Sequence, residues 1–149
     1  MTHLVFSIDE RRFALPATEV VAVVPVTPLR AIDGTPAWVA GLLAHLGTLV
    51  PVVDLCWLHA GRPARPAFAS RIVIARYPRP GGGERHLGLL AEHVTDVAQL
   101  APDAWQDPGL AMPDTPWLGP VADLGGGVLA QRVSVPDLLP QDVRDRLFP

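Results

Sequence analysis

Proline and glycine interrupt this chain every few residues, and this feature restricts its fold more than any other. Among its 149 residues there are 17 prolines and 13 glycines. Both residue types end helices and mark turns, so long helices have little room here. Because 49% of the residues are hydrophobic, the chain can still bury a core. We therefore expect a mainly β protein of about one domain, residues 1–149, with about nine or ten short strands, a number that suits two small barrels.

The most strongly patterned stretch is Gly41–Leu55, in which eight of the fifteen residues are large aliphatics. Its β-branched residues are concentrated after Gly47, which favours strands over a helix. Because a Gly-Thr pair interrupts the run where a tight turn fits, we expect a hairpin that pairs residues 42–46 with 49–53. Pro51 has no N–H to donate to a ladder, so we expect it at a sheet edge or at a bulge.

Shorter apolar runs between polar turns predict the remaining elements. We expect an opening hairpin at 4–8 and 12–15, a strand at 20–24, a hairpin at 72–77 and 86–90, a strand at 94–97, and a last hairpin at 117–124 and 128–133. The best helix candidate is 136–147, with Ser134 or Asp137 near its start. From the alternation of apolar residues, five aliphatic side chains are expected in the core: Val50, Val52, Leu89, Val94 and Leu129.

The charge balance and the single cysteine limit the classes of partner and compartment. The formal net charge is −3, and all 12 basic residues are arginines, which gives no general attraction to nucleic acid or to an anionic membrane. No apolar run reaches the ~18 residues of a membrane span, and the N-terminus lacks the pattern of a secretory signal, so we expect a cytoplasmic protein without membrane insertion. Cys56 has no disulfide partner and is expected as a small filler beside Trp57.

The residues that carry chemistry are scattered and form no recognisable active site. The five histidines, which show no spacing typical of a metal site, are His3, His45, His59, His86 and His93. An unrecognised hydrolase around His93, Asp96 and Asp54 remains an alternative, although strand-end carboxylates usually accept backbone N–H groups instead. We expect no enzyme activity, no metal and no cofactor.

Residues 61–71 form a basic loop that suggests a second alternative. The loop holds Arg62, Arg65, Arg71 and Phe68, and it contains no acidic residue. Arginines beside an aromatic residue can follow a phosphate backbone, so a small β-barrel that binds nucleic acid stays open as an alternative. A solvated connector is the simpler interpretation in an acidic protein, and we expect no nucleic-acid partner.

Taken in order along the chain, several segments resemble the CheW family of chemotaxis coupling proteins. The strongest is Gly47–Leu55, Gly-Thr-Leu-Val-Pro-Val-Val-Asp-Leu, which is similar to the family pattern Arg-Gly-x-Ile-Val-Pro-Val-Val-Asp-Leu. The weaker matches are Leu4–Pro16, Val20–Val23, Thr35–Gly41, Gly88–Val97, Trp117–Val121 and Val128–Ala130. Together they extend over nearly the whole chain without a large insertion.

The resemblance implies a fold of two SH3-like five-stranded β-barrels that share one core, with a short C-terminal helix and an N-terminal strand able to pair with the second barrel. It also implies a non-catalytic adaptor that couples the cytoplasmic tip of a methyl-accepting chemoreceptor to the regulatory domain of a CheA-type histidine kinase. Such a protein is expected in the cytoplasm, held at membrane receptor arrays by these partners. Residues 37–42, 61–64 and 91–93 are also similar to couplers of Wsp-type surface-sensing arrays, whose output is cyclic-di-GMP.

The resemblance further implies a groove between the barrels that binds the receptor or the kinase. The residues at its matching positions are Val20, Ala22, His45, Leu46, Gly47, Val94 and Asp96. The family has an acid where this chain has Ala22, an arginine where it has Leu46, and an asparagine where it has Ala44. Loss of both charges is expected to leave an exposed apolar patch, the usual mark of a binding surface. The alternative is that local packing tolerates the two aliphatic residues, since single apolar residues are common on surfaces.

Overall fold

The computed structural model describes residues 1–79, 83–94, 96–110 and 113–149. Ten strands and two short α-helices, with 3-10 turns between some of them, make up this described part. The strands are β1 (Thr2–Ile8), β2 (Arg11–Pro16), β3 (Val20–Pro25), β4 (Val39–His45), β5 (Thr48–Asp54), β6 (Arg71–Pro78), β7 (Glu84–Ala91), β8 (Asp96–Gln99), β9 (Leu118–Asp123) and β10 (Leu129–Val133). The predicted mainly β class is confirmed.

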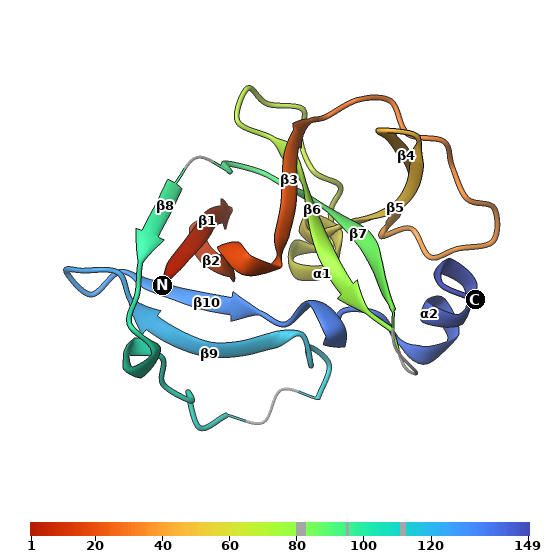
Figure 1. The fold of residues 1–149 in the computed structure, drawn as a ribbon. Coiled ribbons are helices and arrows are strands. Elements are labelled where there is room, and N and C mark those ends of the chain that lie inside the picture. Colours follow the sequence, from red (N-terminus) through yellow and green to blue (C-terminus); the bar gives the residue numbers. More distant parts are fainter. Residues whose placement is uncertain (80–82, 95, 111–112) are drawn as a thin grey trace.

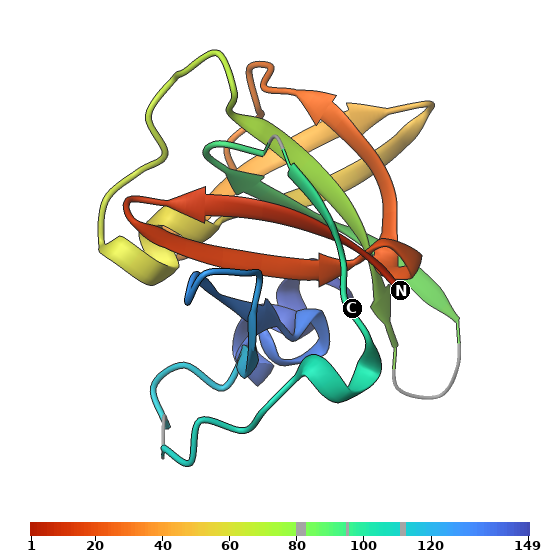
Figure 2. The same ribbon diagram turned by 90° about the vertical axis from the view of Figure 1, so that its left-hand side faces the viewer.

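The strands form two five-stranded sheets that lie against each other (Figure 1, Figure 2). Sheet A has the order β8-β1-β2-β10-β9, and sheet B has the order β3-β6-β7-β5-β4. Sheet A thus joins the first two strands to the last three, whereas sheet B uses the strands between them. The β2–β10 pair of sheet A and the β7–β5 pair of sheet B are parallel, and they hold the same position in the two orders. All other neighbouring pairs are antiparallel. The two sheets therefore repeat one arrangement of strands.

Side-chain alternation gives each sheet two apolar faces. In β1, Phe6 points into a large core shared by both sheets, whereas Val5 points into a small core of sheet A. In β6, Val73 points into the shared core, whereas Ile72 points into a small core of sheet B. The sheet A core consists of Val5, Ala14 and Ala130, and the sheet B core of Leu43, Val50, Val52, Ile72 and Ile74. The prediction of two barrels around a shared core is confirmed.

Three of the five side chains predicted for the core, Val50, Val52 and Leu89, are buried. Val94 is half-buried and packs against the shared core. Leu129 is 57% exposed, so its predicted burial is wrong. The cause is the alternation of β10, which turns Ala130 inward and its neighbour Leu129 outward.

The hairpins β1–β2, β4–β5, β6–β7 and β9–β10 are confirmed within a few residues of their predicted bounds. The turn predicted between β6 and β7 includes 80–82, and the strand predicted at 94–97 includes 95. These residues lie outside the described part of the chain. The described portion of that strand is β8, which begins at Asp96.

Pro51 lies in β5, an interior strand of sheet B, so the sheet edge predicted for it is wrong. The register shift in the β4–β5 pair lies between Val39 and Gly41, one pair before the Leu42–Pro51 pair, and its extra residue is on β4 rather than on β5. The missing N–H is tolerated because the parallel ladder between β5 and β7 involves only the residues from Val52 to Asp54.

Helix α1 (Leu55–Ala60) is not predicted by the sequence patterns, yet both of its ends carry capping residues. The Asp54 carboxylate accepts hydrogen bonds from the backbone N–H groups of Cys56 and Trp57. Gly61 follows the helix with a φ of 70°, a left-handed conformation that favours glycine. The helix therefore depends on its caps and on burial of its apolar residues in the shared core.

The C-terminal helix is shorter than predicted. Helix α2 spans Gln141–Leu147 rather than 136–147, and Val135–Asp137 forms a separate 3-10 turn. The predicted boundary is wrong because Pro140 lacks an N–H and disfavours helical backbone at the residue before it. Both helices are short, and in the described ranges no helix is long and apolar enough to cross a membrane.

Candidate docking groove

The edges of the two sheets leave an apolar hollow between them, which we call the inter-sheet groove. Strand β3, at the edge of sheet B, runs beside the edge strand β8 of sheet A and its neighbour β1 (Figure 1). The groove has a volume of about 190 Å³ and is lined by Thr2 and Leu4 of β1, Ala17 of the 3-10 turn η1 (Ala17–Glu19), Val20 and Val23 of β3, and Val97 of β8. None of these six side chains is charged. Val23 and Val97 are 43% and 66% exposed, so the groove is an accessible apolar surface.

A register shift in β3 decides which of its side chains line the groove. Val20 pairs with Ala75 and Ala22 pairs with Ile74, so one extra residue of β3 is inserted between the two pairs. Such a bulge changes the direction of the side chains that follow it. Val20 and Val23 therefore line the same groove, although residues three apart lie on opposite faces of a regular strand.

Ala22 does not contribute to the groove. Its side chain is half-buried and packs against the sheet B core, as does that of Val24. Ala22 therefore adds little to the exposed apolar surface, and its role in binding stays a prediction. Its neighbour Val23 is the exposed residue of β3 that lines the groove.

His45, Leu46 and Gly47 lie at the end of the β4–β5 hairpin, and none of them lines the inter-sheet groove. Leu46 and Gly47 form a two-residue turn in which both have positive φ, 48° and 79°. Leu46 is 90% exposed, and Leu49, just beyond the turn, is 62% exposed. We call these two leucines the hairpin tip. Because positive φ is sterically unfavourable for leucine, Leu46 occupies a backbone position that asparagine or glycine would adopt with less strain.

The two remaining predicted residues, Val94 and Asp96, do not line the groove. Val94 packs against the shared core, and its N–H donates to the carbonyl of Ala69. Asp96 is exposed at the first position of β8, next to Val97. Of the seven residues predicted for the groove, Val20 is the one that lines it.

Five residues of the groove are not predicted from the sequence: Thr2, Leu4, Ala17, Val23 and Val97. Leu4, Val23 and Val97 lie on predicted strands and Thr2 lies just before one, but local patterns do not reveal which strand edges meet. One signal was available in the run from Val20 to Val24. Five consecutive apolar residues in a short strand place apolar side chains on both of its faces, and this strand does not bury both.

Two of the three arginines of the basic loop, Arg62 and Arg71, make side-chain contacts within the protein. Arg62 donates two hydrogen bonds of 3.0 Å to the carboxylate of Glu92 and one of 2.7 Å to Asp9. These hydrogen bonds lower the pKa of both carboxyl groups. Arg71 donates to two backbone carbonyls at the end of its own loop. With these arginines engaged internally, the nucleic-acid alternative is not favoured.

Arg62, Glu92 and Asp9 form what we call the ionic clamp. Asp9 belongs to the β1–β2 turn of sheet A, and Glu92 follows β7 of sheet B. Glu92 also accepts a hydrogen bond of 2.6 Å from the backbone N–H of Arg65. The clamp therefore ties the two sheets and the basic loop together.

Asp54 and Cys56, whose side chains could take part in a reaction, lie in the interior. The Asp54 carboxylate accepts hydrogen bonds from the N–H groups of Cys56 at 2.9 Å and Ala64 at 2.8 Å, and burial raises its pKa. Its hydrogen bonds go to backbone groups, whereas His93 and Asp96 of the hydrolase alternative are exposed. Burial raises the pKa of the Cys56 thiol to about 12, which suits a core filler.

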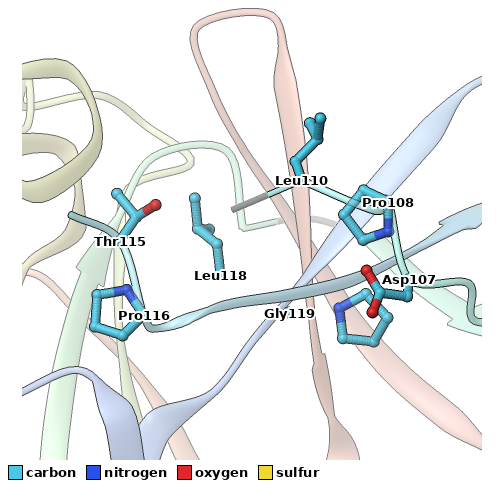
Figure 3. A pocket seen from close by; sticks show the side chains of 8 residues that line it. Asp107, Pro108, Leu110, Thr115, Pro116, Leu118 and Gly119 are labelled. Atoms are coloured by element: carbon cyan, nitrogen blue, oxygen red, sulfur yellow. The ribbon is translucent and has the colours of Figure 1, made fainter. Parts of the chain in front are cut away.

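A larger hollow of about 420 Å³ lies between β9 and the loop that precedes it (Figure 3). Figure 3 shows the Leu118 side chain rising from β9 between Thr115 and Leu110. Prolines form much of the remaining wall. The carboxylate of Asp107 already accepts a hydrogen bond of 2.8 Å from the N–H of Gly109. This hollow is separate from the inter-sheet groove and shares no lining residue with it.

Comparison with known proteins agrees with this architecture. Residues 2–143 match the family of CheW-like domains. A probable chemotaxis protein CheW of Rhizobium etli is 25% identical over 103 residues, which cover 69% of this chain and 63% of that protein, so the chain spans less than two thirds of that relative's length. The crystal structure of the scaffolding protein TtCheW from Thermoanaerobacter tengcongensis has the same fold, with a TM-score of 0.75 and 22% identity, covering 89% of this chain and 82% of that chain. Because the family match extends over nearly all of the sequence, the chain belongs to the CheW-like domain family.

Proposed function

We propose that this protein is a non-catalytic adaptor that couples the cytoplasmic tip of a chemoreceptor to the regulatory domain of a CheA-type histidine kinase. The proposal rests on membership of the CheW-like family together with one structural feature. That feature is the inter-sheet groove, an uncharged hollow left open between the edges of two packed sheets. In this proposal the two barrels act as one domain, residues 1–149, in the cytoplasm at membrane receptor arrays.

An apolar groove of this kind suits the apolar face of a helix from the receptor tip. Removing apolar surface from water contributes roughly 25 cal/mol per Å². Val23 and Val97, exposed on the β3 and β8 sides of the groove, have the most surface to bury. Pro25 ends β3, and a proline on an edge strand limits pairing with an added strand. A helix docked through its side chains is therefore the form of partner that the groove favours.

The hairpin tip is the surface that we assign to the regulatory domain of the kinase. Leu46 keeps an exposed apolar side chain at a strained backbone position, and strain of this kind clusters at functional sites. Burial of Leu46 and Leu49 by a partner would desolvate no charge. Receptor and kinase would then bind different surfaces of one molecule, as a coupling protein requires.

Calorimetry with a chemoreceptor tip and a CheA-type kinase regulatory domain from the same organism tests the proposal. Val23→Asp should weaken receptor-tip binding about tenfold or more, because docking would desolvate a carboxylate. Val26→Asp is the matched control, since Val26 is 45% exposed in the segment that follows β3 but does not line the groove. Equal losses in the two variants, or no binding of the unmodified protein to either partner, would contradict the proposal.

The dependence of binding on salt separates this proposal from the nucleic-acid alternative. Binding at an uncharged groove should change little with salt, whereas neutralisation of phosphates makes affinity fall steeply as salt rises. The assignment to a Wsp-type array stays a prediction. The kind of receptor and kinase genes beside this one tests it.

A further inference from the structure

His3 is a buried polar side chain that the proposed function leaves unused. It lies on β1 between Thr2 and Leu4, which line the inter-sheet groove, and strand alternation turns it to the opposite face. There it is fully buried, and its ring centroid lies 5.2 Å from that of Trp105, which packs against the sheet A core. A buried imidazole therefore stands directly behind the β1 side of the groove.

The imidazole is suited to its neutral form. Its Nδ1 lies 3.2 Å from the carbonyl oxygen of Met1, whereas its Nε2 is buried without a partner in the described part of the chain. A neutral ring with its proton on Nδ1 satisfies Met1 and leaves one unpaired acceptor. A protonated ring would add a charge and a second N–H donor with no acceptor, which is far less favourable in a buried site.

The charged groups around His3 do not compensate for its burial. Burial is the largest influence and lowers the pKa of His3 below its ordinary value of 6.5. The Met1 carbonyl and Glu19 of η1 oppose this shift, whereas Arg132 of β10 and the amino group of Met1 add to it. The folded protein therefore binds this proton less readily than the unfolded chain. Stability is unaffected by His3 above about pH 6.5 and falls as the pH drops below it.

The cover over His3 is a part of sheet A that can open locally. Trp105 lies in the segment after β8, and β8 is an edge strand that pairs with β1 alone. The Met1 carbonyl that faces His3 also accepts a hydrogen bond from the N–H of Leu100, and a single bridge at Gln106 joins the segment to β9. Short elements with few backbone hydrogen bonds open at lower free energy than a core. Water can therefore reach His3 if β8 and the Trp105 segment lift from sheet A.

We propose that His3 is a proton-sensitive latch on residues 96–106. Its neutral ring holds this segment against sheet A, and its protonation in mildly acidic solution releases the segment. Because Val97 of β8 lines the inter-sheet groove, release removes one wall of the groove. Weaker receptor binding at acidic pH follows. That last step rests on the proposed function, whereas the latch itself does not.

Hydrogen exchange of the whole protein, followed by mass spectrometry at about pH 7.5 and about pH 5 and corrected for intrinsic rates, tests the latch. In the unmodified protein, protection of residues 96–106 should fall roughly ten- to hundredfold more than protection of β6 and β7. His3→Phe keeps a ring against Trp105 but has no titrating nitrogen, so this selective response should disappear. His3→Leu repeats the test with a smaller side chain, and a thermal melt checks that each variant folds.

His59→Phe is the matched control for the latch. His59 also has its pKa lowered by burial, but it packs edge-on against Phe13 at the shared core. The selective response of residues 96–106 should persist in this variant. Two results would overturn the latch. The first is that, in the unmodified protein, residues 96–106 lose no more protection at acidic pH than β6 and β7 do. The second is that the selective loss of protection persists in both His3 variants.

Receptor-tip affinity at the same two pH values separates the latch from the proposed function. Affinity that falls at acidic pH in the unmodified protein but not in His3→Phe supports their coupling. If affinity does not change with pH but the exchange response is selective, the latch stands and its coupling to receptor-tip binding is contradicted. Absence of binding at both pH values contradicts the proposed function, and the exchange result still decides the latch.

Discussion

The two sheets are joined at the ionic clamp and left open at the inter-sheet groove. At the clamp, Arg62 links Asp9 of the β1–β2 turn to Glu92 after β7 through three charge-assisted hydrogen bonds. At the groove, β1 meets β3 and β8 with uncharged side chains that remain accessible. Strand β1 connects the two places, since its first residues line the groove and its last residue precedes Asp9.

This difference separates a contact that maintains the fold from a surface available for binding. Charges buried in a protein are tolerated only with partners, and Glu92, whose side chain is 4% exposed, has Arg62 and the N–H of Arg65. Apolar residues such as Val23 and Val97 can remain exposed without a partner, but a complex that buries them is stabilised. A substitution at the clamp should therefore act on stability, and one at the groove should act on binding.

The largest effect on stability is expected from Glu92→Gln. The change leaves Arg62 without its buried charge partner and weakens the hydrogen bond from the N–H of Arg65. The free energy of unfolding in urea should fall by roughly 2–4 kcal/mol. Asp9→Asn is the control, because its half-exposed carboxylate should contribute much less. Equal losses in the two variants would show that Glu92 is not the critical member of the clamp.

A smaller loss is expected from Ala22→Glu, which tests the orientation of β3. Ala22 packs against the sheet B core, so a carboxylate there should lower the free energy of unfolding by about 1–3 kcal/mol. The side chain introduced by Val23→Glu faces the accessible groove, so this variant should change the free energy of unfolding by less than about 0.5 kcal/mol. Thermal and urea unfolding of the two variants measure this difference. If Val23→Glu were the more destabilising, the bulge would not orient β3 as described.

The smallest effect, with the opposite sign, is expected from Leu46→Asn. The change creates an Asn-Gly turn, which favours the positive φ of both residues. Stability should rise by roughly 0.5–1 kcal/mol, while affinity for the kinase regulatory domain falls. A drop in the urea midpoint would argue against strain at Leu46. Unchanged kinase affinity would argue against the role proposed for the hairpin tip.

The strands of this protein were more predictable from sequence than its helices. Apolar runs between proline and glycine turns are local signals, and all four predicted hairpins form. Helix α1 is too short to show a helical period, and its caps, Asp54 and Gly61, were the signals that could have indicated it. The C-terminal helix was predicted too long because Pro136 is compatible with a first turn, whereas Pro140 interrupts a helix.

The groove was less predictable because it depends on contacts between distant parts of the chain. Thr2 and Val97 come from the opening strand and from β8, and nothing in either segment indicates that β3 lies beside them. On β3 the family resemblance pointed to Val20 and Ala22, whereas the groove is lined by Val20 and Val23. A single inserted residue, the bulge between Val20 and Ala22, makes this difference, and such a shift leaves no local pattern.

The most direct test asks whether the groove rather than the clamp is the docking surface. It measures receptor-tip affinity and the free energy of unfolding for two variants, Val23→Asp and Glu92→Gln. Val23→Asp should lower affinity about tenfold or more and leave stability within about 0.5 kcal/mol of the unmodified protein. Glu92→Gln should lower stability and leave the affinity of the folded protein within about twofold. Unmodified affinity in Val23→Asp, or an equal loss of affinity in both variants, would contradict this division between fold and binding.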